Sequence, residues 1–399
     1  MVNNNYRDFI FIIFFIPISL IINMDNGYEY FLFGFLLFIN AYLFTDVSSS
    51  LISKLLFLCF STSIYILCGL YFRENLDVLI GPDEYRFYQE YVDYSYDRIG
   101  YLIDSISHVV DNNFFHSSSY PVFGFFINPL IDFIRFDASS HKYIIPINFF
   151  LLFLILILLK NIFSISKHNN TYILIFSLSP AVIYHSLIYA KDILSLFLIF
   201  LSCLACSRKK VFLFFILLVL ASLLRPYAIA IVFVYLSFFF LSARNISVCV
   251  LVCLLVTYFF VGISGVFNAF ITVPYLVISP NPTNILEGRV DYFPLYFESI
   301  IFSLLYMSSI FACIHRRKLD LLIIFHLCLL VYSVVMVLVG YTGSLSYGNS
   351  YSFGDMGGNL VRKKIPMIPL IILFFYFSFT SIYKEWRCFR YHQSFKLYF

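Results

Sequence analysis

The chain has 399 residues, of which 61% are hydrophobic and 12% charged, and its mean hydropathy is +0.89. Soluble domains carry about 25% charged residues, so this composition excludes an ordinary soluble domain. Long apolar runs recur along the whole length, which predicts a polytopic, all-α membrane protein. The net charge of +4 gives no indication of nucleic-acid binding.

The apolar runs predict about twelve membrane spans within a single integral membrane domain, residues 1–399. Several runs are shorter than the roughly 20 residues of a full crossing, so we expect their ends to extend into polar flanks. The first run is expected to be retained, because no small-residue cleavage pattern follows it. The predicted spans are residues 9–22, 30–44, 51–71, 143–161, 172–189, 193–206, 211–224, 227–241, 247–267, 296–314, 321–339 and 365–383.

The basic residues predict the orientation of these spans. Short basic clusters lie at 207–210, 315–318 and 384–390, and an even number of predicted spans separates each from the next. Because lysine and arginine concentrate in cytoplasmic loops, these clusters and both termini are predicted to be cytoplasmic. The basic residues 362–364 are the exception, because the predicted topology places them on the side of the membrane away from the cytoplasm. Trp386, which lies among basic residues, is expected to anchor a helix at the membrane surface.

Three long connections are then predicted to face outward, away from the cytoplasm. The first, residues 72–142, contains an apolar piece (120–134) that two prolines interrupt, which predicts an interfacial or re-entrant helix. The second covers residues 268–295. The third, residues 340–364, is rich in Gly, Ser and Tyr and is either a mobile lid or a flexible connector.

A dense polar and aromatic cluster lies in the first loop, in the sequence GPDEYRFYQEY. A Gly-Pro turn presents two neighbouring carboxylates, Asp83 and Glu84, and Arg86 and Tyr88 follow them. Charge is scarce in this chain, so such a cluster predicts a site. One of the two carboxylates is predicted to be catalytic, as the general base that deprotonates a hydroxyl group.

Two more charged positions lie at tight hairpin tips that the topology places on the same side. Lys191 and Asp192 separate one pair of predicted spans, and Arg225 and Tyr227 lie between the next pair. Such charges either reach the membrane surface as helix anchors or face a cavity with a partner. The second interpretation is favoured, because charges from several connections would share one face of the bundle.

These side chains suit the transfer of a sugar from a lipid-linked phosphate. Arginine and lysine bind phosphate or pyrophosphate, and tyrosine rings and hydroxyls contact sugars. His185 is interpreted as either a packed core histidine or a donor that lines the cavity. The residues predicted to bind the substrate are Arg86, Tyr88, His185, Lys191, Asp192, Arg225, Tyr227, Glu287, Arg289 and Arg362.

The sequence predicts no metal site and no cofactor. His108, His116 and His141 lie in the first loop without the spacing of a metal motif. Cys203 and Cys206 end an apolar run with no second ligand pair in reach, so they are interpreted as packing residues. The sequence contains no Walker loop, Rossmann fingerprint or nucleophile-elbow motif.

The chain resembles bacterial membrane polymerases of O-antigen or capsule repeat units, the Wzy type. The resemblance rests on the span architecture over nearly the full length and on three local patterns. These are GPDEYRFY in the first outer loop, SP…Y…AKD at Ser179–Asp192 and LLRPY at Leu223–Tyr227. The last two also resemble patterns in membrane glycosyltransferases of the GT-C fold, whose first outer loop carries a catalytic acid.

The resemblance implies a multi-pass enzyme of the bacterial inner membrane that polymerises undecaprenyl-pyrophosphate-linked oligosaccharide repeat units at the periplasmic face. Its expected partners are that glycolipid and the lipid bilayer, with a chain-length regulator as a further candidate and no nucleic acid. Three alternatives stay open: a GT-C-type transferase that uses a polyprenyl-phosphate sugar, an O-antigen ligase and a flippase for lipid-linked glycans. A flippase should have repeat-related halves and charges deep in a central cavity, whereas here charge concentrates in outward loops of unequal size.

Overall fold

The part of the chain that the structure describes is almost entirely helical. The computed structural model describes residues 34–35, 38–39, 51–75, 79, 82–93, 99–100, 103, 119–134, 140–162, 175–281, 292–346, 351–354 and 360–387. Every regular element within these ranges is an α-helix or a 3₁₀-helix, as the all-α prediction requires. The predicted span 9–22, most of 30–44, and His108 and His116 lie outside the described residues.

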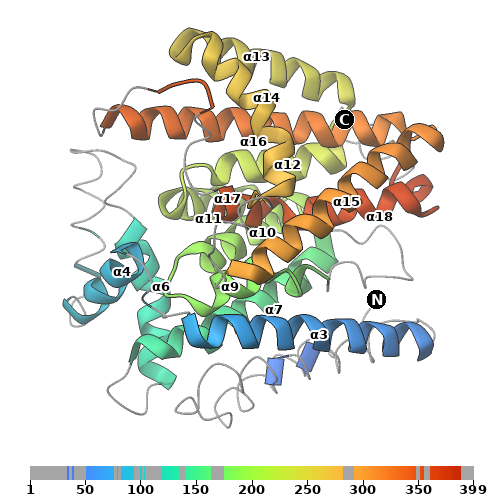
Figure 1. Cartoon of the computed structure of the whole chain (residues 1–399). Coiled ribbons are helices and arrows are strands. Elements are labelled where there is room, and N and C mark those ends of the chain that lie inside the picture. The colour runs from blue at the N-terminus through green and yellow to red at the C-terminus, as the bar shows by residue number, and fades with distance from the viewer. Residues whose placement is uncertain are drawn as a thin grey trace. The chain divides into compact units, whose positions relative to one another are not determined.

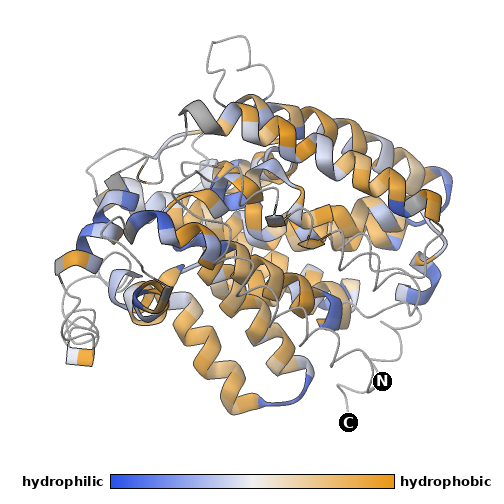
Figure 2. Ribbon diagram, turned by 90° about the horizontal axis from the view of Figure 1, so that it is seen from below, coloured by the Kyte–Doolittle hydropathy of each residue, from blue (hydrophilic) through white to orange (hydrophobic). Residues whose placement is uncertain are grey.

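Five of the described helices are long and apolar enough to cross a membrane, which indicates a membrane protein. Figure 2 shows hydrophobic residues along most of the helices, with hydrophilic residues gathered near several helix ends. A sixth candidate is a bent pair of helices, so the described residues contain five or six candidate spans, and the expected number of about twelve is not confirmed. The five single candidates are Lys54–Phe72, His141–Ile162, Ala243–Val261, Phe293–His315 and Leu319–Leu345.

The helices fall into two compact units, and helix α7 lies at the centre of the first. Unit 1 comprises Met1–Ser164, His168–Pro226 and Val290–Pro294. Helix α7 packs against α6, α9 and α10, and helix α11 packs against α10 and α6 (Figure 1). Helix α4 packs against α6, and helix α3 packs against α9. The helices of unit 1 are α3 (Leu51–Asn75), α4 (Pro82–Asp93), α6 (Ser119–Ile134), α7 (Ile144–Ile162), α9 (Pro180–Leu187), α10 (Asp192–Ser207) and α11 (Val211–Leu224), with the 3₁₀-helix η2 (Ser140–Tyr143) before α7.

Unit 2 is built around the long helix α16. It comprises Ile165–Lys167, Tyr227–Arg289 and Leu295–Phe399. Helix α16 packs against α12, α13, α14 and α18, and α14 also contacts α17. The helices of unit 2 are α12 (Ala228–Phe240), α13 (Ala243–Val261), α14 (Ile263–Ile278), most of α15 (Phe293–His315), α16 (Leu319–Ser346), α17 (Leu360–Lys364), the 3₁₀-helix η5 (Ile365–Met367) and α18 (Ile368–Phe379).

The predicted spans 172–189 and 193–206 are not two full crossings. Helix α9 has eight residues and is therefore only about 12 Å long, well below the thickness of a bilayer core. It begins at Pro180, with the Ser179 hydroxyl accepting a hydrogen bond from the backbone N–H of Val182, and ends at Leu187. Helix α10 then leaves at 115° to α9, so the two helices form one broken span or a re-entrant loop.

The predicted span 247–267 is also wrong at its C-terminal end. Helix α13 stops at Val261, and α14 begins at Ile263 and continues to Ile278, inside the loop predicted for 268–295. The break falls at Gly262, whose φ of 80° is a conformation that residues with a side chain rarely adopt. Nothing lies within 4 Å of a Cβ built there, so the backbone conformation rather than space selects glycine.

Basic residues at one end of unit 2 cap a helix. The Lys318 Nζ donates hydrogen bonds to the carbonyl oxygens of Phe377, Ser378 and Thr380, at 2.7, 3.0 and 2.7 Å. These carbonyl groups lie at the C-terminal end of α18, where the helix dipole favours a cation. Burial lowers the pKa of the Lys318 ammonium, and the neighbouring charge of Arg316 lowers it further.

Trp386 does not act as the predicted surface anchor. Its side chain is fully buried and packs against Phe238, Phe377 and Tyr383, with ring centres 5.2, 5.9 and 5.8 Å apart. Aromatic rings of α12 and α18 surround the Trp386 side chain in the interior of unit 2. The basic residues next to Trp386 in the sequence do not indicate this buried location.

Candidate functional site

Asn148 of α7 stabilises the break between α9 and α10, residues 188–191, which we call the α9–α10 break. The Asn148 Nδ2 donates hydrogen bonds to the main-chain oxygens of Ser186 and Ile188, both at 3.2 Å, and its side chain is fully buried. Carbonyl groups at the end of a helix lack helical partners and are costly to bury unpaired. Asn148 therefore allows a non-helical stretch to lie inside unit 1.

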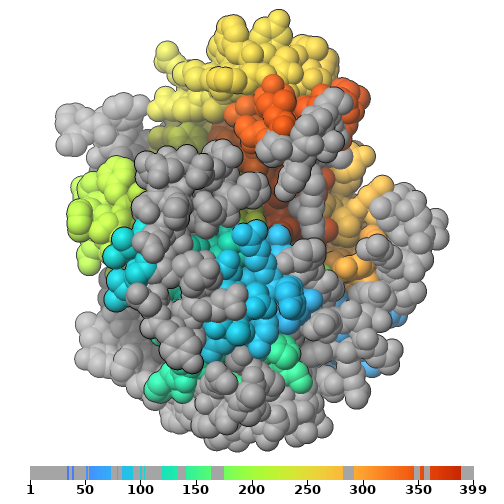
Figure 3. Space-filling view, turned by 90° about the vertical axis from the view of Figure 1, so that its left-hand side faces the viewer, coloured from blue at the N-terminus to red at the C-terminus, as the bar shows by residue number. Residues whose placement is uncertain are grey.

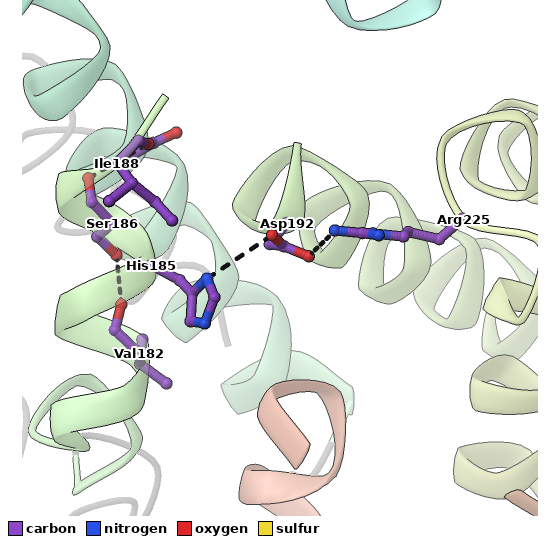
Figure 4. Close-up of polar contacts among 7 residues, drawn as sticks. Val182, His185, Ser186, Ile188, Asp192 and Arg225 are labelled. Carbon is purple, nitrogen blue, oxygen red and sulfur yellow. Dashed lines mark hydrogen bonds and ion pairs between the residues drawn. The ribbon is translucent and has the colours of Figure 1, made fainter. Parts of the chain in front are cut away.

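Asp192 lies between His185 and Arg225 in a charged group next to this break (Figure 4). The Nη2 of Arg225 donates a hydrogen bond to Oδ1 of Asp192, and Oδ2 of Asp192 lies 3.7 Å from Nδ1 of His185. The side chains of His185, Asp192 and Arg225 are 3%, 6% and 14% exposed, so the ion pair is largely removed from solvent. Asp192 is the first residue of α10, where the helix dipole favours a negative charge.

Helix α4 packs its aromatic residues against the same break. The Lys191 Nζ lies 5.5 Å from the centre of the Phe87 ring, and the rings of Tyr88 and Tyr189 have centres 5.8 Å apart. Residues four apart share one face of a helix, so Asp83 lies on the face of α4 that carries Phe87. The acidic helix of the first predicted loop and the charged break therefore meet within unit 1.

The two carboxylates of α4 differ in their access to solvent. Asp83 is exposed, whereas Glu84 is only 6% exposed. Figure 3 shows α4, in light blue, on the face of the molecule turned to the viewer. An external ligand can thus reach Asp83 more readily than Glu84.

Arg86 and Tyr120 add a second polar contact beside these carboxylates. Arg86 is exposed, and its guanidinium carbon lies 4.6 Å from the centre of the Tyr120 ring on α6. Burial raises the pKa of the Tyr120 phenol, and the charge of Arg86 opposes this rise. The Tyr120 hydroxyl is therefore protonated at neutral pH and can donate a hydrogen bond.

Unit 1 contains six of the predicted substrate-binding residues, while the other four lie elsewhere. Tyr227 and Arg362 belong to unit 2, where Tyr227 packs edge-on against Tyr332. Glu287 and Arg289 lie outside the described residues. The six in unit 1 are Arg86, Tyr88, His185, Lys191, Asp192 and Arg225.

Unit 2 has a buried ion pair of its own, between Lys364 at the end of α17 and Glu298 on α15. The Lys364 Nζ lies 3.0 Å from Oε1 of Glu298, and the two side chains are 0% and 3% exposed. The same ammonium donates a hydrogen bond of 2.7 Å to the carbonyl oxygen of Ser279 and lies 4.5 Å from the centre of the Phe302 ring.

Asn148, Tyr189, Glu298 and Lys364 are not among the residues predicted from sequence. Asn148 and Glu298 are isolated polar residues within apolar runs, a pattern that in a membrane indicates a partner or a function. That signal could have identified them. Tyr189 and Lys364 carry no such signal, because tyrosine is abundant in this chain and Lys364 lies in a basic cluster.

The charged group of unit 1 has the features of an anion-binding site. Two cations, Lys191 and Arg225, and the carboxylate of Asp192 lie at the α9–α10 break. Guanidinium groups bind phosphate in a bidentate way, and an ion pair fixes the guanidinium of Arg225 in one orientation. Ionisable side chains that are buried within a helical membrane protein are costly and commonly mark functional sites.

The fold and these contacts define the class of the protein: an α-helical membrane protein with a broken helix pair and a buried charged group beside the break. No protein-family model matches the chain, and comparisons with curated proteins and with solved structures give no significant match either.

Proposed function

We propose that this protein polymerises undecaprenyl-pyrophosphate-linked oligosaccharide repeat units into O-antigen or capsular polysaccharide at the periplasmic face of a bacterial inner membrane. The observation that carries the proposal is the packing of α4 on the α9–α10 break, through Lys191 on Phe87 and Tyr88 on Tyr189. This packing gathers carboxylates, cations and tyrosines in one part of unit 1. Those are the groups that transfer of a sugar from a pyrophosphate carrier requires.

In the proposed reaction, Asp83 accepts the proton of the acceptor hydroxyl group, with the buried Glu84 as the second candidate base. The hydroxyl oxygen forms a bond to the anomeric carbon of the donor sugar, and the bond from that carbon to the pyrophosphate oxygen breaks. The pyrophosphate leaves with the electron pair, and Arg86, Lys191 and Arg225 stabilise its negative charge.

Asp192 and His185 would act through Arg225 in this scheme. Asp192 accepts a hydrogen bond from the guanidinium and so limits the orientations that Arg225 can adopt. A cation that is already oriented loses little conformational freedom when it binds a phosphate. The buried ion pair is therefore interpreted as the support of the anion site.

The proposal can be tested in a strain that lacks the gene. Loss of a polymerase should leave a single repeat unit on the lipid core, which gel analysis of lipopolysaccharide separates from long-chain polymer. Complementation with Asp83→Asn/Glu84→Gln should not restore long chains, and Arg225→Lys should restore them poorly, because lysine keeps the charge but lacks the bidentate geometry. Both variants must be present in the membrane at the parental level.

Two matched controls lie outside the proposed site. Glu385→Gln removes an exposed carboxylate, and Arg208→Ala removes an exposed guanidinium from the turn between α10 and α11. Both should restore long-chain polymer. Full-length polymer in Asp83→Asn/Glu84→Gln and in Arg225→Lys would show that the proposed site is wrong.

A flippase for lipid-linked glycans is the second candidate, and the broken helix pair favours it. Discontinuous helices with charged groups at the break occur at the binding sites of transporters. The same deletion strain separates the two functions. Loss of a flippase should leave no glycan on the lipid core, whereas loss of a polymerase should leave one repeat unit.

A further inference from the structure

The turn between α15 and α16, residues 315–318, ends α15 in a backbone conformation that normally selects glycine. Arg317 has a φ of 53°, in the left-handed region that residues with a Cβ rarely adopt. The Arg317 amide donates a hydrogen bond of 3.2 Å to the carbonyl oxygen of Ile314, and the Lys318 amide donates one of 2.8 Å to that of Cys313. These two bonds form a Schellman motif, in which the left-handed residue is usually glycine. An arginine there is unfavourable for the backbone, which points to a role for its side chain.

A basic residue also replaces glycine at the end of α10. Among the described residues, the non-glycine residues with a positive φ are Arg317 and Lys209, whose φ is 58°. Asparagine and aspartate adopt this conformation more readily than lysine or arginine. The side chain, rather than the backbone, therefore determines which residue lies at both helix ends.

The basic side chains of the α15–α16 turn differ in their partners. Arg316 donates a hydrogen bond to the carbonyl oxygen of Phe379, and Lys318 caps the same end of α18 (Figure 1). Arg317 is exposed, and its guanidinium makes no hydrogen bond or ion pair with any described residue. Arg317 is thus accessible to an external anion.

Lys384 places a second accessible cation at this end of unit 2. It follows Tyr383, whose ring centre lies 5.2 Å from the Lys318 Nζ and whose hydroxyl donates a hydrogen bond to Asp320. Lys384 is exposed, and within the described part of the chain its ammonium has no hydrogen bond or ion pair. This end of unit 2 attracts anions, because positive charge is in excess there. Residues 315–320 and 381–387 together contain five lysine and arginine residues and two acidic residues, which leaves an excess of three positive charges.

An apolar face of α15 leads up to the basic turn. Four large apolar side chains recur there every three or four residues, with exposed fractions of 57% to 78%, so they share one face of the helix. They are Leu304, Met307, Phe311 and Ile314. In a membrane protein, an exposed apolar face of this kind contacts the acyl chains of lipids. The face ends three residues before Arg317, so a surface for acyl chains and an accessible cation are neighbours in the chain.

We propose that Arg317 and Lys384 bind the phosphate group of an anionic phospholipid, whose acyl chains contact the exposed apolar face of α15. The excess of positive charge favours an anionic headgroup over a zwitterionic one. An aqueous anion or an acidic peptide would bind the cations but would leave the apolar face uncovered. This lipid site lies within unit 2 and does not depend on the function proposed above.

The test measures which lipid lies against α15. The full-length protein is reconstituted in phosphatidylcholine vesicles that contain a trace of photoreactive phosphatidylglycerol, with the reactive group in the acyl chain, or of photoreactive phosphatidylcholine with the same chains. Labelling of peptides covering 304–323 is divided by labelling of α13, whose exposed apolar side chains report general contact with lipid. Because each cation near the membrane surface contributes to the attraction, this ratio should be at least about fivefold higher for phosphatidylglycerol.

Arg317→Gln/Lys384→Gln should lower the phosphatidylglycerol ratio to within about twofold of the phosphatidylcholine ratio, because both accessible cations are lost. The matched control is Lys142→Gln/Arg244→Gln, which removes two exposed cations elsewhere and should keep the parental ratio. Arg317→Gly separates the lipid site from folding. It should also lower the phosphatidylglycerol ratio, but it should not lower the melting temperature in detergent, because glycine adopts a φ of 53° freely.

Three outcomes would overturn the proposal. In the first, the parent is labelled equally by the two photoreactive lipids. In the second, Arg317→Gln/Lys384→Gln keeps the parental preference, or the matched control loses it to the same extent. In the third, millimolar inorganic phosphate abolishes the preference for phosphatidylglycerol, which would identify the occupant of the basic surface as an aqueous anion rather than a lipid.

Discussion

The buried pair of Asp192 and Arg225 gives a quantitative prediction about the α9–α10 break. Replacing one partner leaves the other charged and buried, which typically costs about 3–5 kcal/mol. Arg225 keeps 14% of its side-chain surface exposed and Asp192 only 6%. Asp192→Asn, which removes the carboxylate from the more exposed arginine, should therefore cost about 3 kcal/mol, and Arg225→Gln somewhat more.

The double variant Asp192→Leu/Arg225→Met should be much less destabilised than the two single changes together. Replacing both members of a buried ion pair with apolar side chains is often neutral or stabilising. We expect the double-variant cost to fall short of the sum of the single costs by at least about 3 kcal/mol, a factor of roughly 100 in the equilibrium constant.

The measurement is the free energy of local opening of residues 180–207, obtained from native-state amide hydrogen exchange in detergent. The control is Arg387→Gln, which removes a 53% exposed arginine located 3.4 Å from Asp320 and should cost less than about 1 kcal/mol. If Asp192→Asn and Arg225→Gln cost no more than this exposed pair, the charged group beside the break is solvated and cannot act as a rigid support.

Three further predictions concern buried polar side chains that form hydrogen bonds with backbone groups. Asn148→Leu leaves two buried carbonyl groups without this donor and should lower the free energy of opening of α9 by about 2 kcal/mol or more, measured by hydrogen exchange. Lys318→Met removes three hydrogen bonds from the end of α18 and should lower the melting temperature in detergent, whereas Arg317→Met, an exposed neighbour, should not. Asn268→Leu should accelerate exchange of the Gly354 amide more than tenfold with little change in α16. Parental behaviour in any of these variants would contradict the corresponding hydrogen bonds.

The apolar runs in the sequence correctly predicted the positions of several helices. These helices form where a local run of apolar side chains can be buried. Helix α11 begins and ends at the residues predicted for it, 211–224, and α7 and α15 differ from their predicted spans by a few residues. The sequence predicted a turn at Lys191 and Asp192, but it did not predict that α9 is only eight residues long, because the apolar sequence continues on both sides of the turn. The break depends on Asn148, about 40 residues earlier in the chain, which pairs the carbonyl groups that the turn releases.

The sequence predicted those site residues whose charges stand out between apolar runs. It did not predict which charged residues, far apart in the chain, form a pair. Asp192 and Arg225 were singled out because charge is rare between apolar runs, and the structure places them in contact. Glu298 and Lys364 are more deeply buried than Asp192 and Arg225, but one is a single acid in a predicted span and the other lies in a basic cluster. Only the three-dimensional structure shows that they are partners.

The distance along the chain between Glu298 and Lys364 has a consequence for biosynthesis. The lysine is made 66 residues after the glutamate (364 minus 298). At about 5–20 residues per second, the ribosome therefore needs several seconds to supply it. During that interval Lys364 is not yet available to contact the Glu298 carboxylate of α15, and an acidic residue within a membrane span costs a few kcal/mol. A chain that stops before residue 360 would lack the lysine that contacts this carboxylate.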